Sequence, residues 1–210
     1  MIGRAIVGSL LFAISLTTPS AAQQDSIVYV VAPGSRFEVT AHKSGLFSFA
    51  GHEHLIRARS FSGTIVYVPS APQQSRFAIV VPSESLEVLT PPDTEEIRKV
   101  TAAMRTDVLD VAHYPDIRFV STALTRTDGG FHVTGRLMIV GKSQDVTLDI
   151  QTTTGPDTLR ATGGFEVLQT AFGIRPYHGG PGGVVRVADR VTFHFEVIAL
   201  PCGPSCVPGR

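Results

Sequence analysis

The sequence predicts an all-β fold in which one antiparallel sheet curves around an apolar interior, with a single short α-helix inserted near residues 93–106. Two observations lead to this prediction. Segments in which apolar and polar residues alternate recur at fairly regular spacing with turn residues between them, which is typical of antiparallel barrels and sandwiches. The chain also has 12 phenylalanines and no tryptophan, and phenylalanine rings fill or line an apolar interior without needing a hydrogen-bond partner.

Residues 1–22 are expected to form a secretory signal peptide that precedes the fold. Arg4 supplies a positive charge, residues 5–16 are apolar but too short to span a bilayer comfortably, and the small residues at 19–22 suit cleavage before Gln23. An uncleaved N-terminal anchor is the alternative. No later segment is long and apolar enough to cross a membrane. We therefore expect a soluble protein exported to the periplasm.

The first half of the remaining chain contains several short segments with one apolar face. Alternation with a period of two places alternate side chains on one side of a strand, and prolines stop two of these runs at Pro69 and Pro82. The expected strands are 27–31, 36–42, 46–50, 61–67 and 77–81.

A helical pattern interrupts the strands after residue 92. Asp93 can cap a helix, and Glu96 three residues later completes a capping box. Ile97, Val100 and Met104 then fall on one helical face. The sequence therefore predicts one amphipathic helix over about residues 93–106.

The clearest hairpin signal lies at residues 131–150. Apolar residues take alternate positions over 131–139, a polar break follows at 141–144, and a second alternating run covers 146–150. Two such runs joined by a short link that contains glycine indicate a β-hairpin. The other strands expected in this half begin at Ile117 or cover 159–167 and 191–197. One domain over residues 23–200 and a Pro/Gly/Cys tail at 201–210 account for the rest of the chain.

The charge balance limits the partners. Eighteen basic residues stand against 18 acidic ones, and no basic cluster indicates nucleic acid or an anionic membrane surface. We expect no nucleic acid as partner and no stable membrane insertion, and we leave a homodimer open. The two cysteines, Cys202 and Cys206, are expected to form a disulfide in an oxidising compartment. A metal or redox role for this pair is weaker, because no second pair of ligands lies nearby in sequence.

Several stretches, taken together, resemble the YceI-like family of exported lipid-binding domains. The most specific is 109–119, in which Tyr114-Pro115 leads to a strand that carries phenylalanine. The others are Phe47-Ser48-Phe49-Ala50-Gly51-His52, Arg59-Ser60-Phe61-Ser62-Gly63-Thr64-Ile65, the hairpin at 135–143 and the turn Ala171-Phe172-Gly173-Ile174. Order and spacing agree over roughly residues 27–200.

This resemblance implies an extended, lipocalin-like antiparallel barrel around a long apolar cavity. It also implies that the protein binds a polyisoprenoid chain or an isoprenoid quinone and is not an enzyme. No cofactor is expected apart from that bound lipid. The sequence departs from the family at 168–171, which lacks the arginine that the family usually carries before the Phe-Gly turn. His52 corresponds to a histidine of the family, whereas His54 is additional.

Apolar residues on the expected inner faces are candidates for the cavity wall. The alternative for each of them is that its side chain simply fills a solid core. The candidates are Phe37, Phe47, Phe49, Phe61, Ile65, Phe77, Ile79, Phe119, Leu137, Ile139, Phe165, Phe172, Phe193 and Phe195.

The histidines are the main polar candidates. His52 and His54 are two residues apart, so both face the same side of a strand. At the mouth of a barrel they are expected to hydrogen-bond a quinone carbonyl or a lipid headgroup. A periplasmic metal or haem site that uses this pair, with His42 or His178 nearby, is the alternative. Catalytic residues are not expected, because no nucleophile elbow or metalloprotease motif is present.

Overall fold

The computed structural model describes residues 25–44, 53–90, 94–179 and 185–203. Several predictions concern residues outside these ranges: the signal peptide at 1–22, Phe47, Phe49, His52, Asp93 and Cys206. None of the helices in the described ranges has the length and apolar character needed to cross a membrane.

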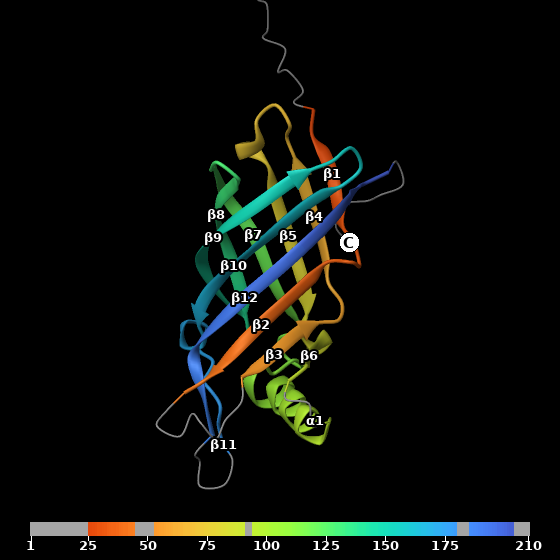
Figure 1. Cartoon of the computed structure of the whole chain (residues 1–210). Coiled ribbons are helices and arrows are strands. Elements are labelled where there is room, and N and C mark those ends of the chain that lie inside the picture. Colours follow the sequence, from red (N-terminus) through yellow and green to blue (C-terminus); the bar gives the residue numbers. More distant parts are fainter. Residues whose placement is uncertain (1–24, 45–52, 91–93, 180–184, 204–210) are drawn as a thin grey trace, which may run out of the picture.

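Eight antiparallel strands close into a barrel, as the sequence predicts (Figure 1). The last strand pairs with the first, with Tyr29 opposite Pro201 and Val31 opposite Ala199. In their order around the barrel the strands are β1 (Ile27–Val31), β4 (Ser62–Tyr67), β5 (Arg76–Pro82), β7 (Asp116–Arg126), β8 (Gly130–Ile139), β9 (Lys142–Thr154), β10 (Leu159–Leu168) and β12 (Val185–Pro201).

The long strand β12 also carries an extension of the sheet. Residues of β2 pair with the first part of β12, where the register shifts between Val187 and Val191 and marks a β-bulge. The extension continues in the order β2 (Arg36–Lys43), β3 (His54–Ala58) and β6 (Leu86–Val88), and β11 (His178–Gly179) pairs with the start of β12. The apolar pattern of the sequence did not predict β3 and β6, which are only 5 and 3 residues long.

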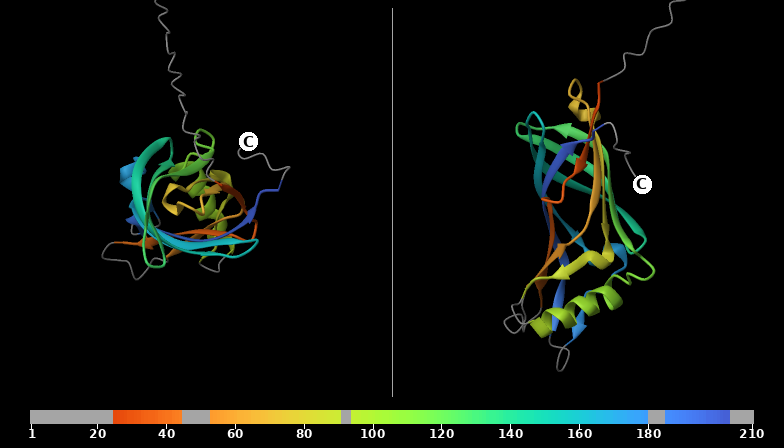
Figure 2. Two further views of the ribbon diagram at one scale, coloured as in Figure 1. Left: turned by 90° about the horizontal axis from the view of Figure 1, so that it is seen from above. Right: turned by 90° about the vertical axis from the view of Figure 1, so that its right-hand side faces the viewer.

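The predicted helix is present and covers one end of the barrel (Figures 1 and 2). It comprises α1 (Thr94–Ala103) and continues in a π-helical turn, η4 (Met104–Val108). Ile97, Val100 and Met104 pack against the barrel core, in agreement with the face predicted for them. We call the end of the barrel under α1 the helix end, and the opposite end the far end. Single-turn 3₁₀ helices are η2 (Pro72–Gln74), η3 (Ser83–Ser85) and η5 (Gln169–Phe172).

The predicted hairpin is formed by β8 and β9, but its turn is shorter than the polar break suggested. Ile139 pairs with Lys142, so the turn consists of Val140 and Gly141 alone, and residues 142–144 belong to β9. Both turn residues have positive φ, 44° and 71°, as a type I′ turn requires. Valine rarely adopts positive φ, which is why the sequence pattern placed the turn too late.

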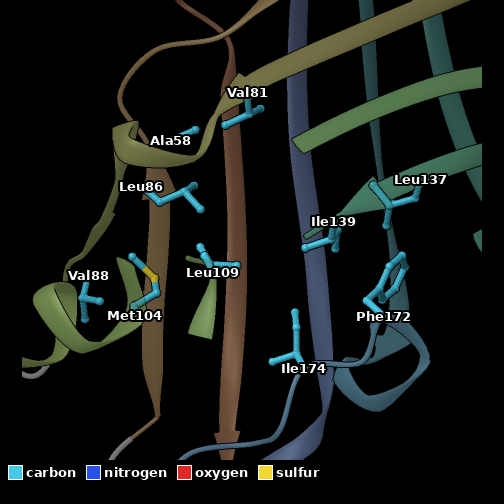
Figure 3. Close-up of a cluster of buried hydrophobic side chains, with 10 residues drawn as sticks. All are labelled: Ala58, Val81, Leu86, Val88, Met104, Leu109, Leu137, Ile139, Phe172 and Ile174. Carbon is cyan, nitrogen blue, oxygen red and sulfur yellow. The ribbon is translucent and has the colours of Figure 1, made fainter. Parts of the chain in front are cut away.

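Buried apolar side chains form three clusters. The helix-end cluster lies where α1, η4 and η5 meet the strands, and Figure 3 shows its members: Ala58, Val81, Leu86, Val88, Met104, Leu109, Leu137, Ile139, Phe172 and Ile174. A second cluster contains Tyr29, Val31, Ile65, Leu159, Ala161, Val197 and Ala199, and a third contains Val133, Leu148 and Ile150. Partly buried phenylalanines pack between the clusters, and they bound the space described next.

Candidate functional site: an apolar cavity inside the barrel

The barrel contains a cavity of about 250 Å³. This value is the volume in which the centre of a water molecule can lie. One water needs roughly 10–15 Å³ on this measure, so the space is far larger than a packing defect. Of the 35 described residues that line it, 30 are apolar. The five polar ones are Glu38, Ser75, Thr152, Gln169 and His194.

Phenylalanine rings form much of the wall. Six of them come from β2, β5, β7, β10 and β12 and are only half-buried, although they belong to the inner faces of their strands. Phe172, which also lines the cavity but packs within the helix-end cluster, is by contrast 1 % exposed. We attribute the remaining exposure of the six rings to the cavity that they border. These residues are Phe37, Phe77, Phe119, Phe165, Phe193 and Phe195.

Ring pairs hold these side chains against the wall. Phe77 stacks on Phe119 with centroids 5.5 Å apart, and Phe165 stacks on Phe193 at 4.7 Å with nearly parallel planes. Offset aromatic pairs of this kind contribute beyond their buried area. These rings therefore have packing partners within the wall and do not need to fill the centre to find them.

Two glycines make room for rings on neighbouring strands. A Cβ atom at Gly135 would lie 2.1 Å from Cζ of Phe119, and one at Gly163 would lie 2.7 Å from Cζ of Phe195. The rings therefore lie over glycine backbone instead of projecting toward the axis of the barrel. These glycines keep the cavity open at the level of the rings.

The structure brings most of the predicted cavity residues to the wall. Those that line it are Phe37, Ile65, Phe77, Ile79, Phe119, Leu137, Ile139, Phe165, Phe172, Phe193 and Phe195. Phe61 is placed differently: it precedes β4, and its ring packs edge-on against Phe37 with centroids 4.9 Å apart, so it backs the wall. Phe47 and Phe49 lie outside the described residues. That the lining residues contact a ligand stays a prediction.

Many lining residues are not among the cavity residues predicted from the sequence. On the predicted strands, the same alternation that marked their neighbours could have found them: Val39, Ala41, Val81, Ile117, Leu124, Leu148, Ile150, Leu159, Ala161, Val167, Val191 and Val197. Met104 lies on the predicted helical face, although it was not a candidate for the cavity. No comparable signal marks the others, which come from the short strands β3 and β6 and from turns: Ile56, Ala58, Leu86, Val108, Leu109 and Ile174.

Among the described lining residues, two polar ones are buried, Ser75 and Gln169. Oγ of Ser75 accepts a hydrogen bond from the backbone N–H of Val68 at 3.0 Å. Nε2 of Gln169 donates to the backbone oxygen of Ala188 at 2.8 Å. Glu38, in contrast, is ion-paired with Arg57, whose Nε donates to Oε1 at 2.7 Å. The buried part of the wall thus offers two neutral polar groups.

The histidines do not gather around one point in the described structure. His54 opens β3 on the same side as Ile56 and Ala58, and its Nδ1 donates to the backbone oxygen of Thr90 at 2.9 Å. His52 lies outside the described residues, so the predicted pair stays a prediction. In the ranges that the structure describes, no group of three His, Cys, Asp or Glu residues could hold a metal ion.

His42 belongs to a polar network on the outer face. Its Nδ1 donates to Oε1 of Glu53 at 2.9 Å, and its Nε2 lies 3.0 Å from Oγ1 of Thr192. The hydrogen bond from His42 lowers the pKa of Glu53 from its ordinary value. Arg190 donates to Glu166 at 2.6 Å and likewise lowers the pKa of that carboxyl. This network joins β2, β12 and β10 from outside and does not face the cavity.

The predicted disulfide also stays a prediction, because Cys206 lies outside the described residues. The backbone N–H of Cys202 donates to the oxygen of Val28 at 2.7 Å, which ties the chain after β12 to β1.

The fold and its cavity define a closed antiparallel β-barrel with an apolar interior large enough for a guest. The chain belongs to the YceI-like domain family, whose model matches residues 30–199. No curated protein sequence matches the chain.

Solved structures share the fold. BcnA of Burkholderia cenocepacia superposes with a TM-score of 0.61 at 21 % identity, over 78 % of this chain and 95 % of that one. A polyisoprenoid binding domain from Saccharophagus degradans, implicated in plant cell wall breakdown, gives 0.56 at 12 % identity, over 84 % and 99 %. The Campylobacter jejuni YceI protein gives 0.54 at 16 % identity, over 69 % and 83 %.

Proposed function

We propose that the protein binds an apolar isoprenoid lipid or quinone inside the barrel and carries or sequesters it without chemical turnover. The observation that carries this proposal is the cavity, whose described wall is apolar at 30 of 35 residues. An eight-stranded barrel has an interior just wide enough to hold one small ligand when side chains do not fill it.

An apolar chain is the ligand that such a wall favours. Moving each CH₂ group from water into an apolar site contributes about 0.8 kcal/mol, so affinity grows with the length of apolar contact and needs few polar groups. The lining residues come from all three apolar clusters, from Ile65 and Leu159 to Met104 at the helix end. A long, flexible chain can use this whole length.

The family supports the same ligand class. The chain is a YceI-like domain, and one structure with the same fold is described as a polyisoprenoid binding domain. At 12 % identity that description supports the class of ligand by analogy of fold, and the cavity of this chain supplies the physical reason.

We further propose that the protein acts in the periplasm after export. The support is the positive, apolar and small-residue sequence of residues 1–22. The mass of the purified protein from a periplasmic extract tests this, and we expect the chain to begin at Gln23. A chain that keeps residues 1–22, or one found only in the cytoplasm, would contradict export.

Extraction of the purified protein with a mild organic solvent, followed by mass spectrometry, tests the lipid. We expect a co-purified isoprenoid lipid, and uptake of added prenol or quinone by protein that has been stripped of it. If the protein carries no lipid and takes up neither probe, the carrier function is wrong.

A pair of variants links the result to the cavity. Ala161 is buried and lines the cavity, whereas Ala123 is exposed on β7. Ala161→Leu adds volume inside the barrel and is expected to lower the amount of lipid bound per protein, while Ala123→Leu adds the same side chain outside and is expected to leave it unchanged. Equal loss in both variants would point to a nonspecific effect.

A further inference from the structure

Gln169 is a buried amide in an apolar environment. It begins η5 directly after β10, is 9 % exposed, and belongs to the cavity wall at the helix end. Phe172 and Ile174, which follow it, are buried members of the helix-end cluster and line the same cavity. A carboxamide is an unusual group in such a wall, because burying a polar group is unfavourable unless it forms hydrogen bonds.

One hydrogen bond fixes which way the amide faces. Nε2 donates to the oxygen of Ala188 at 2.8 Å, and Ala188 lies in the bulge of β12 between Val187 and Val191. Of the two ends of the amide, only the NH₂ group can donate to a backbone oxygen, so the nitrogen must be on this side and the side-chain oxygen on the other. Among the described residues, no donor reaches Oε1 of Gln169, and this oxygen remains available as an acceptor.

We propose that Oε1 of Gln169 accepts a hydrogen bond from a hydroxyl group at the head of the bound lipid. This inference rests on the proposed function and deepens it, because it assigns the head to the helix end and its chemistry to a hydroxyl donor. The tail then extends along the phenylalanine wall toward the far end. The bond to Ala188 holds the amide ready, so little side-chain freedom is lost on binding.

Two probes with the same chain test the head directly. Geranylgeraniol has a terminal hydroxyl, whereas its methyl ether has the same chain and no donor. The wild-type protein is expected to bind the alcohol about three- to tenfold more tightly than the ether in a competition assay, which is the range that one hydrogen bond supplies. Equal binding of the two probes would overturn the inference and leave the lipid-binding function intact. Binding of neither would contradict the proposed function itself.

Substitution of Gln169 then locates the interaction. Gln169→Met keeps the length of the side chain and removes the acceptor, so the ratio of the affinities for the alcohol and the ether should fall to about one. Loss of the Ala188 bond alone would lower the unfolding temperature without changing the ratio of the two affinities. A folded Gln169→Met variant that retains the alcohol preference would contradict the assignment.

Gln144→Met is the matched control. Gln144 is exposed on β9 and is not part of the cavity wall, and its Nε2 likewise donates to a backbone oxygen, that of Ala171 at 2.8 Å. We expect this variant to keep the wild-type preference for the alcohol. If Gln144→Met removes the preference as Gln169→Met does, the loss is not specific to Gln169 and the inference is wrong.

Discussion

Gly135 is important because it has no Cβ atom. The ring of Phe119 occupies the space where a Cβ atom of residue 135 would be, 2.1 Å from Cζ. In Gly135→Ala the ring must turn toward the cavity, because the backbone of β8 is fixed by pairing on both sides. We expect less lipid bound per protein and a loss of about 1–3 kcal/mol in the free energy of unfolding, as for other overpacked sites. Lipid extraction and urea unfolding measure the two effects.

Two further variants separate this effect from a general intolerance of substituted glycines. Gly34→Ala meets only ordinary contact, with its nearest atom at 3.5 Å, and is expected to bind lipid normally. Phe119→Leu combined with Gly135→Ala removes the clash and should restore lipid binding. Full lipid binding by Gly135→Ala alone would show that the ring does not control the width of the cavity.

Gly173 illustrates the second use of glycine, a left-handed backbone. It ends η5 with φ of 73°, and its N–H donates to the oxygen of Thr170 at 2.9 Å. Gly173→Ala is expected to lower the free energy of unfolding by about 1–2 kcal/mol, because a side chain in this conformation meets the neighbouring carbonyl. Gly155→Ala, whose φ is not positive and whose nearest atom is 3.6 Å away, is the control in urea unfolding and should cost less. Equal costs would remove conformation as the cause.

At the scale of elements, α1 was predictable and its continuation was not. Ile97, Val100 and Met104 recur at helical spacing and mark the face that packs on the barrel. The chain then takes one π-helical turn, η4, which has no signature in a 3.6-residue pattern. That turn places Val108 and Leu109 in the cavity wall together with Met104. The sequence therefore predicted a helix but not its contribution to the site.

Met104, the first residue of η4, packs at the helix end of the barrel. It is 8 % exposed and lies between α1 and the strands. Met104→Ala is expected to lower the free energy of unfolding by about 2–5 kcal/mol, the range for truncated core side chains, and to speed release of bound lipid. Met138→Ala removes the same side chain from the outer side of β8, where it is only half-buried, and should cost less. Identical release rates for both variants would exclude the helix formed by α1 and η4 as the element that closes this end.

At the scale of the whole molecule, the alternation of apolar and polar residues predicted most of the strands. The closure of the barrel and the presence of the cavity depend on contacts between residues that are far apart in the sequence. The barrel closes through β1 and β12, where Val30 pairs with Leu200, and no local pattern specifies that contact. The cavity depends on rings such as Phe119 lying over glycine on another strand. The sequence could therefore predict which residues face inward but not whether their side chains meet in the middle.

A barrel with an empty interior should gain stability from its guest. Any ligand that binds only the folded state stabilises it, by about 2.7 kcal/mol at a free concentration of 100 times Kd. We expect protein stripped of lipid to unfold at a lower temperature than the purified form, and added prenol to restore the difference in a concentration-dependent manner. Calorimetry checks this. An unfolding temperature that does not respond to added lipid would argue for a solid interior.

The outer-face network connects stability to pH. Hydrogen bonds from His42 and Arg190 lower the pKa of Glu53 and Glu166 below the ordinary 4.5 in the folded protein. Both carboxylates therefore contribute stability that is fully present above pH 4.5 and is lost as the pH falls through their lowered values. We expect urea midpoints to decrease below pH 4.5, and less steeply in Glu166→Gln. Because Glu166 and Arg190 are both substantially exposed, added salt should reduce the difference. Glu84→Gln, at an exposed position of η3, serves as the control. The same loss of stability below pH 4.5 in all three proteins would rule out Glu166 as a source of the pH dependence.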